Sequence, residues 1–188
     1  MTRPELPTHA IVEGRFPSPR VQERPMAALK SMEDLFMHTL KDVYYAEKAI
    51  YRSLPKMMKQ ATSRDLKQAL EKHREETEVQ IERLEKIFEQ CDVAARGVRC
   101  EAMDGILAEA KDIMEEVEDA EVRDAGMLAA AQNVEHYEIS RYGTMIAWAK
   151  QLGMPEAVKL LQLTLDEEKN TDRLLSDLAM KTINQAAA

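Results

Sequence analysis

Two acidic side chains interrupt the apolar face of a helix predicted for residues 155–182. Glu168 and Asp172 lie one turn apart, and their face is otherwise apolar: Leu161, Leu165, Leu175 and Ala179. Burying a carboxylate without a partner is costly, so such a group usually takes up a proton, a counter-charge or a metal ion. The pattern therefore predicts a polar site inside the fold.

The same interruption recurs on three other predicted helices, at Glu47, Glu76 and Glu138. Hairpin geometry would bring these carboxylates and Glu168 to one level, where their negative charges repel unless protons or cations lie between them. Two divalent ions bridged by carboxylates would satisfy that charge, as in di-iron and di-manganese bundles. Oxygen ligands combined with a histidine favour iron or manganese over metals that prefer thiolates.

Further donors share these faces. His73 lies three residues before Glu76, which reverses the Glu-x-x-His order usual in such bundles, and Glu135 lies three residues before Glu138. Asp172 could reach the same site from the turn after Glu168. His136 points away from this face, so we expect it to be an outer-sphere or interface residue at best.

Each candidate also has an ordinary structural explanation. Glu76 lies in the charged run EKHREETE, and such runs are usually solvated. Glu167 could replace Glu168 if the helix were shifted by one residue, and Asp172 could pair with a neighbouring lysine or arginine. Buried tyrosine hydroxyls are more often hydrogen-bonded than redox-active. The metal site is nevertheless favoured, because four helices carry candidates at one level.

The elements that would position these residues are all helical, since apolar positions recur with helical spacing and strand-like alternation is absent. Helices are predicted at 31–58, 63–90, 102–118, 121–152 and 155–182, with Ser31 as the first N-cap and Pro55 as a kink or end of the first helix. Short turns join the first two and the last two long helices into hairpins. We therefore expect an all-α, ferritin-like four-helix bundle, with a long crossover that carries the short extra helix.

The domain boundaries follow from the same pattern. Residues 1–28 lack helical periodicity and contain most of the prolines, so they are predicted to be a disordered or loosely packed arm, and residues 29–188 to be the bundle domain. The two hairpins also show a weak internal repeat. YAEKAIY (45–51) aligns with HYEISRY (136–142), and REETEVQ (74–80) aligns with DEEKNTD (166–172).

Composition limits the partners. The chain has 188 residues and a net charge of −8, without a basic patch, which argues against nucleic acid or an anionic membrane surface as a partner. No apolar run approaches the roughly 20 residues of a transmembrane helix, and no export signal is visible. Cys91 and Cys100 lack the spacing of a zinc site. We therefore expect a cytoplasmic protein.

Three segments resemble the YciE/YciF-type ferritin-like stress proteins of bacteria: HREETEVQIERLEKI, EVRDAGMLAAAQNVEHYEISRYGT and LLQLTLDEEKNTDRLLSDLA. The resemblance covers about residues 31–185. It implies a fold like that of rubrerythrin and manganese catalase, a dinuclear metal site and a homodimer. It also implies a set of ligands: Glu47, His73, Glu76, Glu138, Glu168 and Asp172, with Glu135 as a seventh candidate.

The favoured function is a di-metal protein, with iron or manganese, that acts on hydrogen peroxide or dioxygen under stress. If it is an enzyme, it would be an oxidoreductase of peroxidase or catalase type. The chain has no Cys-x-x-Cys pair, so a rubrerythrin-type cycle would need an external reductant. The alternatives are a non-catalytic dimeric bundle with a structural or vestigial metal site, and an iron store, which is less favoured.

Overall fold

The computed structural model describes residues 29–188. The arm expected at 1–28 lies outside the described residues. The described part is all-helical, which confirms the predicted class, and the bounds agree with those expected to within a few residues. The elements are α1 (Met32–Gln60), α2 (Arg64–Gln90), α3 (Glu101–Glu116), α4 (Ala120–Gln151), α5 (Pro155–Leu178), a π-helical turn (Ala179–Ile183) and α6 (Asn184–Ala186).

Local sequence signals explain where the helices begin. The Ser31 hydroxyl accepts a hydrogen bond from the backbone N–H of Asp34 at 3.0 Å, as the predicted N-cap requires. Asp119 caps α4 in the same way, and Pro155 occupies the first turn of α5. Helix α1 does not end at Pro55 but continues to Gln60. At the other end of the chain the last predicted helix changes to a wider π-helical turn, in which Ala179 and Ile183 are both buried.

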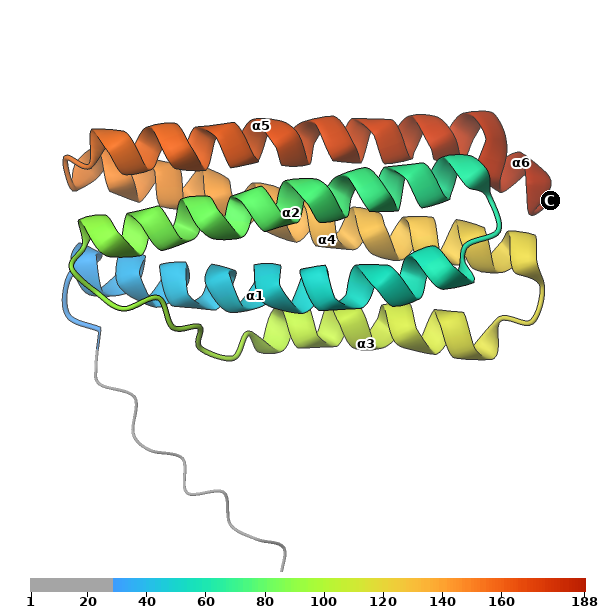
Figure 1. Ribbon diagram of the computed structural model, residues 1–188, viewed down its shortest axis with the longest axis horizontal. Helices are drawn as coiled ribbons and strands as arrows, with labels where there is room; N and C mark the ends of the chain where they lie inside the picture. Colours follow the sequence, from blue (N-terminus) through green and yellow to red (C-terminus); the bar gives the residue numbers. More distant parts are fainter. Residues whose placement is uncertain (1–28) are drawn as a thin grey trace, which may run out of the picture.

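The long helices form two antiparallel hairpins, α1–α2 and α4–α5, that pack side by side (Figure 1). Helix α1 contacts α2 and α4, and α5 contacts α2 and α4. Residues 91–119 carry the chain from one end of the bundle to the other, and α3 packs along α1 and α4 (Figure 1). The predicted crossover with its short helix is therefore present.

The crossover is fixed to α1 before α3 begins. The Val98 N–H donates to the Lys41 carbonyl at 3.1 Å. A Cβ atom at Gly97 would lie 2.9 Å from Cβ of Tyr45, so only glycine fits at this close approach. Cys91 and Cys100 are both free.

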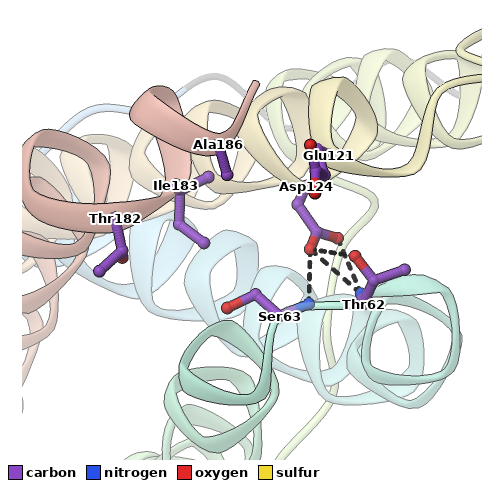
Figure 2. A pocket seen from close by; sticks show the side chains of 7 residues that line it. All are labelled: Thr62, Ser63, Glu121, Asp124, Thr182, Ile183 and Ala186. Carbon is purple, nitrogen blue, oxygen red and sulfur yellow. Dashed lines mark hydrogen bonds between the residues drawn. The ribbon is translucent and has the colours of Figure 1, made fainter. Parts of the chain in front are cut away.

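A buried aspartate fixes the α1–α2 turn to α4 (Figure 2). Asp124 accepts hydrogen bonds from the Thr62 N–H at 2.9 and 3.1 Å, from the Thr62 hydroxyl at 2.7 Å and from the Ser63 N–H at 2.6 Å. It lines a surface pocket together with Ile183 and Ala186 from the C-terminal turns (Figure 2). Its carboxylate, 3% exposed, is fully satisfied by protein donors.

The apolar core is divided into two clusters. The Phe36 core includes Phe36, Leu40, Phe88, Tyr142, Met145 and Leu161. The Leu54 core includes Ile50, Leu54, Leu66, Leu70, Leu128 and Leu175. On α2, α4 and α5 buried polar residues separate the two sets along the sequence, and on α1 Glu47 lies near the point where one set replaces the other. A polar layer therefore crosses the middle of the bundle. Within residues 29–188, every helix is too short or too polar to span a bilayer.

Candidate metal centre

The polar layer contains five buried ionisable side chains contributed by all four long helices. Glu47 comes from α1, His73 from α2, Glu135 and Glu138 from α4, and Glu168 from α5. The four glutamates are at most 1% exposed and His73 is 4% exposed. The helices place them there because each lies on the apolar face of its own helix, as the sequence indicated.

These residues form two triads that share Glu168. The Glu47 triad is Glu47, Glu138 and Glu168, and the His73 triad is His73, Glu135 and Glu168. Within each triad, one ligand atom from every residue lies within 4.8 Å of the others. A carboxylate common to both triads can bridge two ions, which is the arrangement of dinuclear bundles.

Most ligand atoms of the centre have no hydrogen-bond partner. Both oxygens of Glu135, Glu138 and Glu168, one oxygen of Glu47 and both ring nitrogens of His73 are buried without a hydrogen bond. Nε2 of His73 lies 3.5 Å from Oε1 of Glu135. Buried polar atoms in folded proteins nearly always have partners, so such a concentration requires an explanation. Bound cations would satisfy these atoms, and four carboxylates balance the charge of two divalent ions.

Burial and mutual repulsion disfavour the charged forms of these groups when no metal is bound. Burial, followed by the charge of Glu168, raises the pKa of Glu47 from 4.5 to about 8. Burial is also the main reason that the pKa of Glu168 rises to about 7, and that the pKa values of Glu135 and Glu138 lie well above 4.5. Burial lowers the pKa of His73 from 6.5 to about 4. The metal-free centre therefore holds protons on its carboxyls, whereas His73 is neutral and has a free lone pair.

Tyr142 closes the Glu47 side of the centre. Its hydroxyl donates to Oε1 of Glu47, and the side chain is completely buried. Burial raises the pKa of Tyr142 well above its usual value, so it stays a hydrogen-bond donor. Three other tyrosine hydroxyls also have partners, as expected for buried tyrosines: Tyr44 donates to Glu85, Tyr45 to Asp104 and Tyr137 to Asp42.

The structure resolves the ambiguity of the Glu167–Glu168 pair. Glu168 faces the centre, whereas Glu167 faces Arg83 of α2, whose guanidinium donates to both of its carboxylate oxygens. The buried side chain of Gln80 donates to the same carboxylate at 3.1 Å. Nothing in the sequence marks Arg83 as part of the site, and the signal for Gln80 is its alignment with Asp172 in the weak repeat.

Glu76 and Asp172 belong to neither triad, so as ligands they remain predictions. Glu76 pairs with Lys72, and the Thr171 hydroxyl donates to it at 3.4 Å. Asp172 lies 3.1 Å from Nε2 of His136 and accepts a bond from Gln132 at 3.4 Å. Their side chains are 21% and 26% exposed.

The other five predicted residues come together in the two triads. They include Glu135, which the family resemblance gave only as a seventh candidate ligand. At the α2 position His73, rather than Glu76, projects into the centre.

Comparison with known proteins agrees with this architecture. Residues 31–188 match the family model described as a domain of unknown function, DUF892. The chain belongs to this family. It is 46% identical to Protein YciF of Escherichia coli K12 over 160 residues, which are 85% of this chain and 96% of that protein.

Two solved structures of relatives have the same fold. The crystal structure of the E. coli stress protein YciF matches with a TM-score of 0.79 and 46% identity, over 83% of this chain and 99% of that one. YcfI from Rhodopseudomonas palustris matches with a TM-score of 0.77 and 49% identity, over 79% of this chain and 94% of that one. The resemblance noted from the sequence motifs is thereby confirmed.

Proposed function

We propose that this DUF892 protein binds two divalent ions, iron or manganese, and uses them to reduce a small oxidant such as hydrogen peroxide or dioxygen. One observation carries the proposal: two buried triads share Glu168, and nearly all of their ligand atoms lack hydrogen-bond partners. A bound pair of redox-active ions would supply two electrons to the oxidant.

The donor set supports the choice of metal. The triads offer carboxylate oxygens and the imidazole of His73, but no thiolate. Cys100 is engaged elsewhere, since its sulfur lies 3.0 Å from the Tyr137 hydroxyl. Oxygen-rich sites with one nitrogen suit iron and manganese better than zinc or copper.

The protein's own residues would hold the ions and manage protons. Glu168 would fix the spacing of the two ions, and Tyr142 would hold Glu47 in one orientation. Because the carboxyls are protonated in the metal-free protein, ions would displace protons when they bind. Reducing one hydrogen peroxide to two waters consumes two electrons and two protons. The electrons that restore the centre would come from an external reductant.

Elemental analysis of protein purified without added metal tests the binding step. We expect two ions per chain in the wild type and in the exposed-residue control Glu156→Ala, and loss of ions in Glu138→Ala and Glu168→Ala. Retention of two ions in both site variants would refute the site. Consumption of peroxide or dioxygen by the loaded protein, with a reductant, then tests turnover.

The same measurements separate the alternatives. A non-catalytic bundle would bind two ions but consume no oxidant, and an iron store would take up many ions per chain. The homodimer implied by the resemblance remains a prediction, which sedimentation of the purified protein would check.

A further inference from the structure

A cluster of polar residues lies between one side of the centre and the surface, along the α4–α5 contact. Asp172 lies one turn after Glu168 on α5, and Gln132 lies about one turn before Glu135 on α4. The Gln132 amide donates to Asp172 at 3.4 Å and to the Ser176 hydroxyl at 2.9 Å. Asp172 therefore occupies the turn next to the His73 triad.

Exposure decreases steadily along this cluster toward the centre. The side chain of His136 is 68% exposed, that of Asp172 is 26% exposed, and Glu135 and Glu168 are completely buried. His136 Nε2 lies 3.1 Å from Asp172 Oδ1, so the two can offer a nitrogen and an oxygen to one cation. Behind them, both oxygens of Glu135 and of Glu168 have no partner. A cation held between His136 and Asp172 would thus lie about one helical turn from the carboxyl oxygens of Glu135 and Glu168.

On the α2–α5 side the carboxylates near the centre are already paired with cationic side chains. Arg83 holds Glu167 through both carboxylate oxygens, and Lys72 pairs with Glu76. A divalent cation that approached there would have to displace an ammonium or a guanidinium group. By contrast, within residues 29–188 no lysine or arginine lies within ion-pair distance of Asp172. An incoming cation at Asp172 would therefore meet the His136 imidazole and the Gln132 amide and, among the described residues, no lysine or arginine that it would have to displace.

We propose that His136 and Asp172 form an outer landing site, through which divalent cations pass to reach Glu135 and Glu168. This inference rests on the proposed dinuclear centre and adds its route of loading. Buried, metal-binding carboxylates need such a route, because each ion must lose its water in steps and exchange it for protein oxygen atoms. Asp172 is then a transit residue and not a permanent ligand.

The experiment follows the loading of metal-free, full-length protein with cobalt(II), mixed in a stopped-flow instrument and observed by visible absorption. The test variants are Asp172→Asn and His136→Ala. The matched control is Asp177→Asn, which removes the same charge from a half-exposed aspartate on the same helix. Equilibrium dialysis of each protein against cobalt(II) gives the number of ions bound.

We expect Asp172→Asn to slow loading by about tenfold or more at low ionic strength, since a charge at an entrance raises association rates by about that factor or more. His136→Ala should slow loading less, Asp177→Asn should load like the wild type, and all should bind two ions at equilibrium. Loading of Asp172→Asn at the rate of Asp177→Asn would overturn the route. Loss of an ion from Asp172→Asn would also overturn it, because Asp172 would then be a resident ligand. If the wild type itself binds no ions, it is the proposed function that fails.

Discussion

Asp124 and Glu138 are both carboxylates on α4 that lie buried in the bundle, yet their surroundings are opposite. Asp124 accepts hydrogen bonds from two backbone N–H groups and one hydroxyl at the α1–α2 turn. Glu138 has no hydrogen-bond partner for either oxygen, and it forms a triad with Glu47 and Glu168, which also have unsatisfied oxygens. The first carboxylate is satisfied by the protein and stabilises the fold. The second is costly to the fold unless something outside the chain binds it.

Removing the Asp124 carboxylate should give the largest loss of stability. In Asp124→Ala the Thr62 and Ser63 donors lose the buried acceptor that ties their turn to α4, and we expect unfolding to require about 1–3 kcal/mol less free energy. Urea titration followed by circular dichroism measures this. Metal stoichiometry should remain unchanged, because Asp124 belongs to neither triad. A variant as stable as the wild type would show that the hydrogen bonds from Thr62 and Ser63 to Asp124 contribute little to stability.

The free energy of unfolding of the metal-free protein should decrease as pH rises, because of the buried carboxyls of the centre. Glu47 and Glu168 keep their protons in the folded chain up to about pH 8 and about pH 7, whereas the unfolded chain loses them near 4.5. The unfolded state therefore binds fewer protons between these values, and stability decreases with pH across that window, by an amount on the order of a few kcal/mol. His73, with a pKa lowered to about 4, acts in the opposite sense and contributes stability that is lost as pH falls below 6.5.

Urea titrations of metal-free protein at several pH values check this slope. The metal-loaded protein should show little of the decrease, because bound ions replace the protons. Metal-free protein that became more stable from pH 5 to pH 8 would contradict the buried-carboxylate interpretation.

Glu138→Gln should have a smaller effect, and one of the opposite sign to that of Asp124→Ala. The substitution keeps the shape of the side chain. It also removes the cost of keeping this buried carboxyl protonated at a pH at which it ionises in the unfolded chain, so the metal-free protein should be more stable by about 1–2 kcal/mol at pH 8. It should also lose the ion of the Glu47 triad and keep that of the His73 triad. Thermal melting with and without manganese, together with metal analysis, tests both statements. If metal-free Glu138→Gln melted at a lower temperature than the metal-free wild type, Glu138 would stabilise the fold as Asp124 does, and the prediction would be wrong.

The sequence predicts Glu138 as a buried site residue but does not single out Asp124, although both lie at helical spacing on the same face of α4. Asp124, Leu128, Ala131 and Glu135 follow one another at helical spacing, just as Glu138 and Tyr142 do. What distinguishes Asp124 is a partner 62 residues away in the chain, and helical periodicity does not predict which residues of distant segments meet. The helices, the hairpins and the crossover could be predicted, because they follow from local apolar spacing and turn residues.

Which residues of α2 enter the metal centre is harder to predict from the sequence, for a related reason. His73 and Glu76 share one face of α2, and a rotation of a fraction of a turn decides which of them reaches the centre. Packing of α2 against α5 sets that rotation: Gln80 and Arg83 bind Glu167, and His73 is thereby turned inward while Glu76 lies at the surface with Lys72. These contacts between helices carry no periodic signature in the sequence.

Glu47 is intermediate between Asp124, whose oxygens are satisfied, and Glu138, whose oxygens are not. The smallest predicted effect concerns this residue. One of its oxygens accepts the Tyr142 hydroxyl, as the oxygens of Asp124 accept their donors, and the other has no partner, as in Glu138. In Tyr142→Phe the ion of the Glu47 triad should bind about tenfold more weakly, since outer hydrogen bonds that orient a ligand contribute about that much. The ion of the His73 triad should keep its affinity, because no bond from Tyr142 reaches its residues. Competition titrations with a chelator resolve the two affinities, and an equal loss at both ions would mean that Tyr142 acts through the packing of the bundle and not through Glu47.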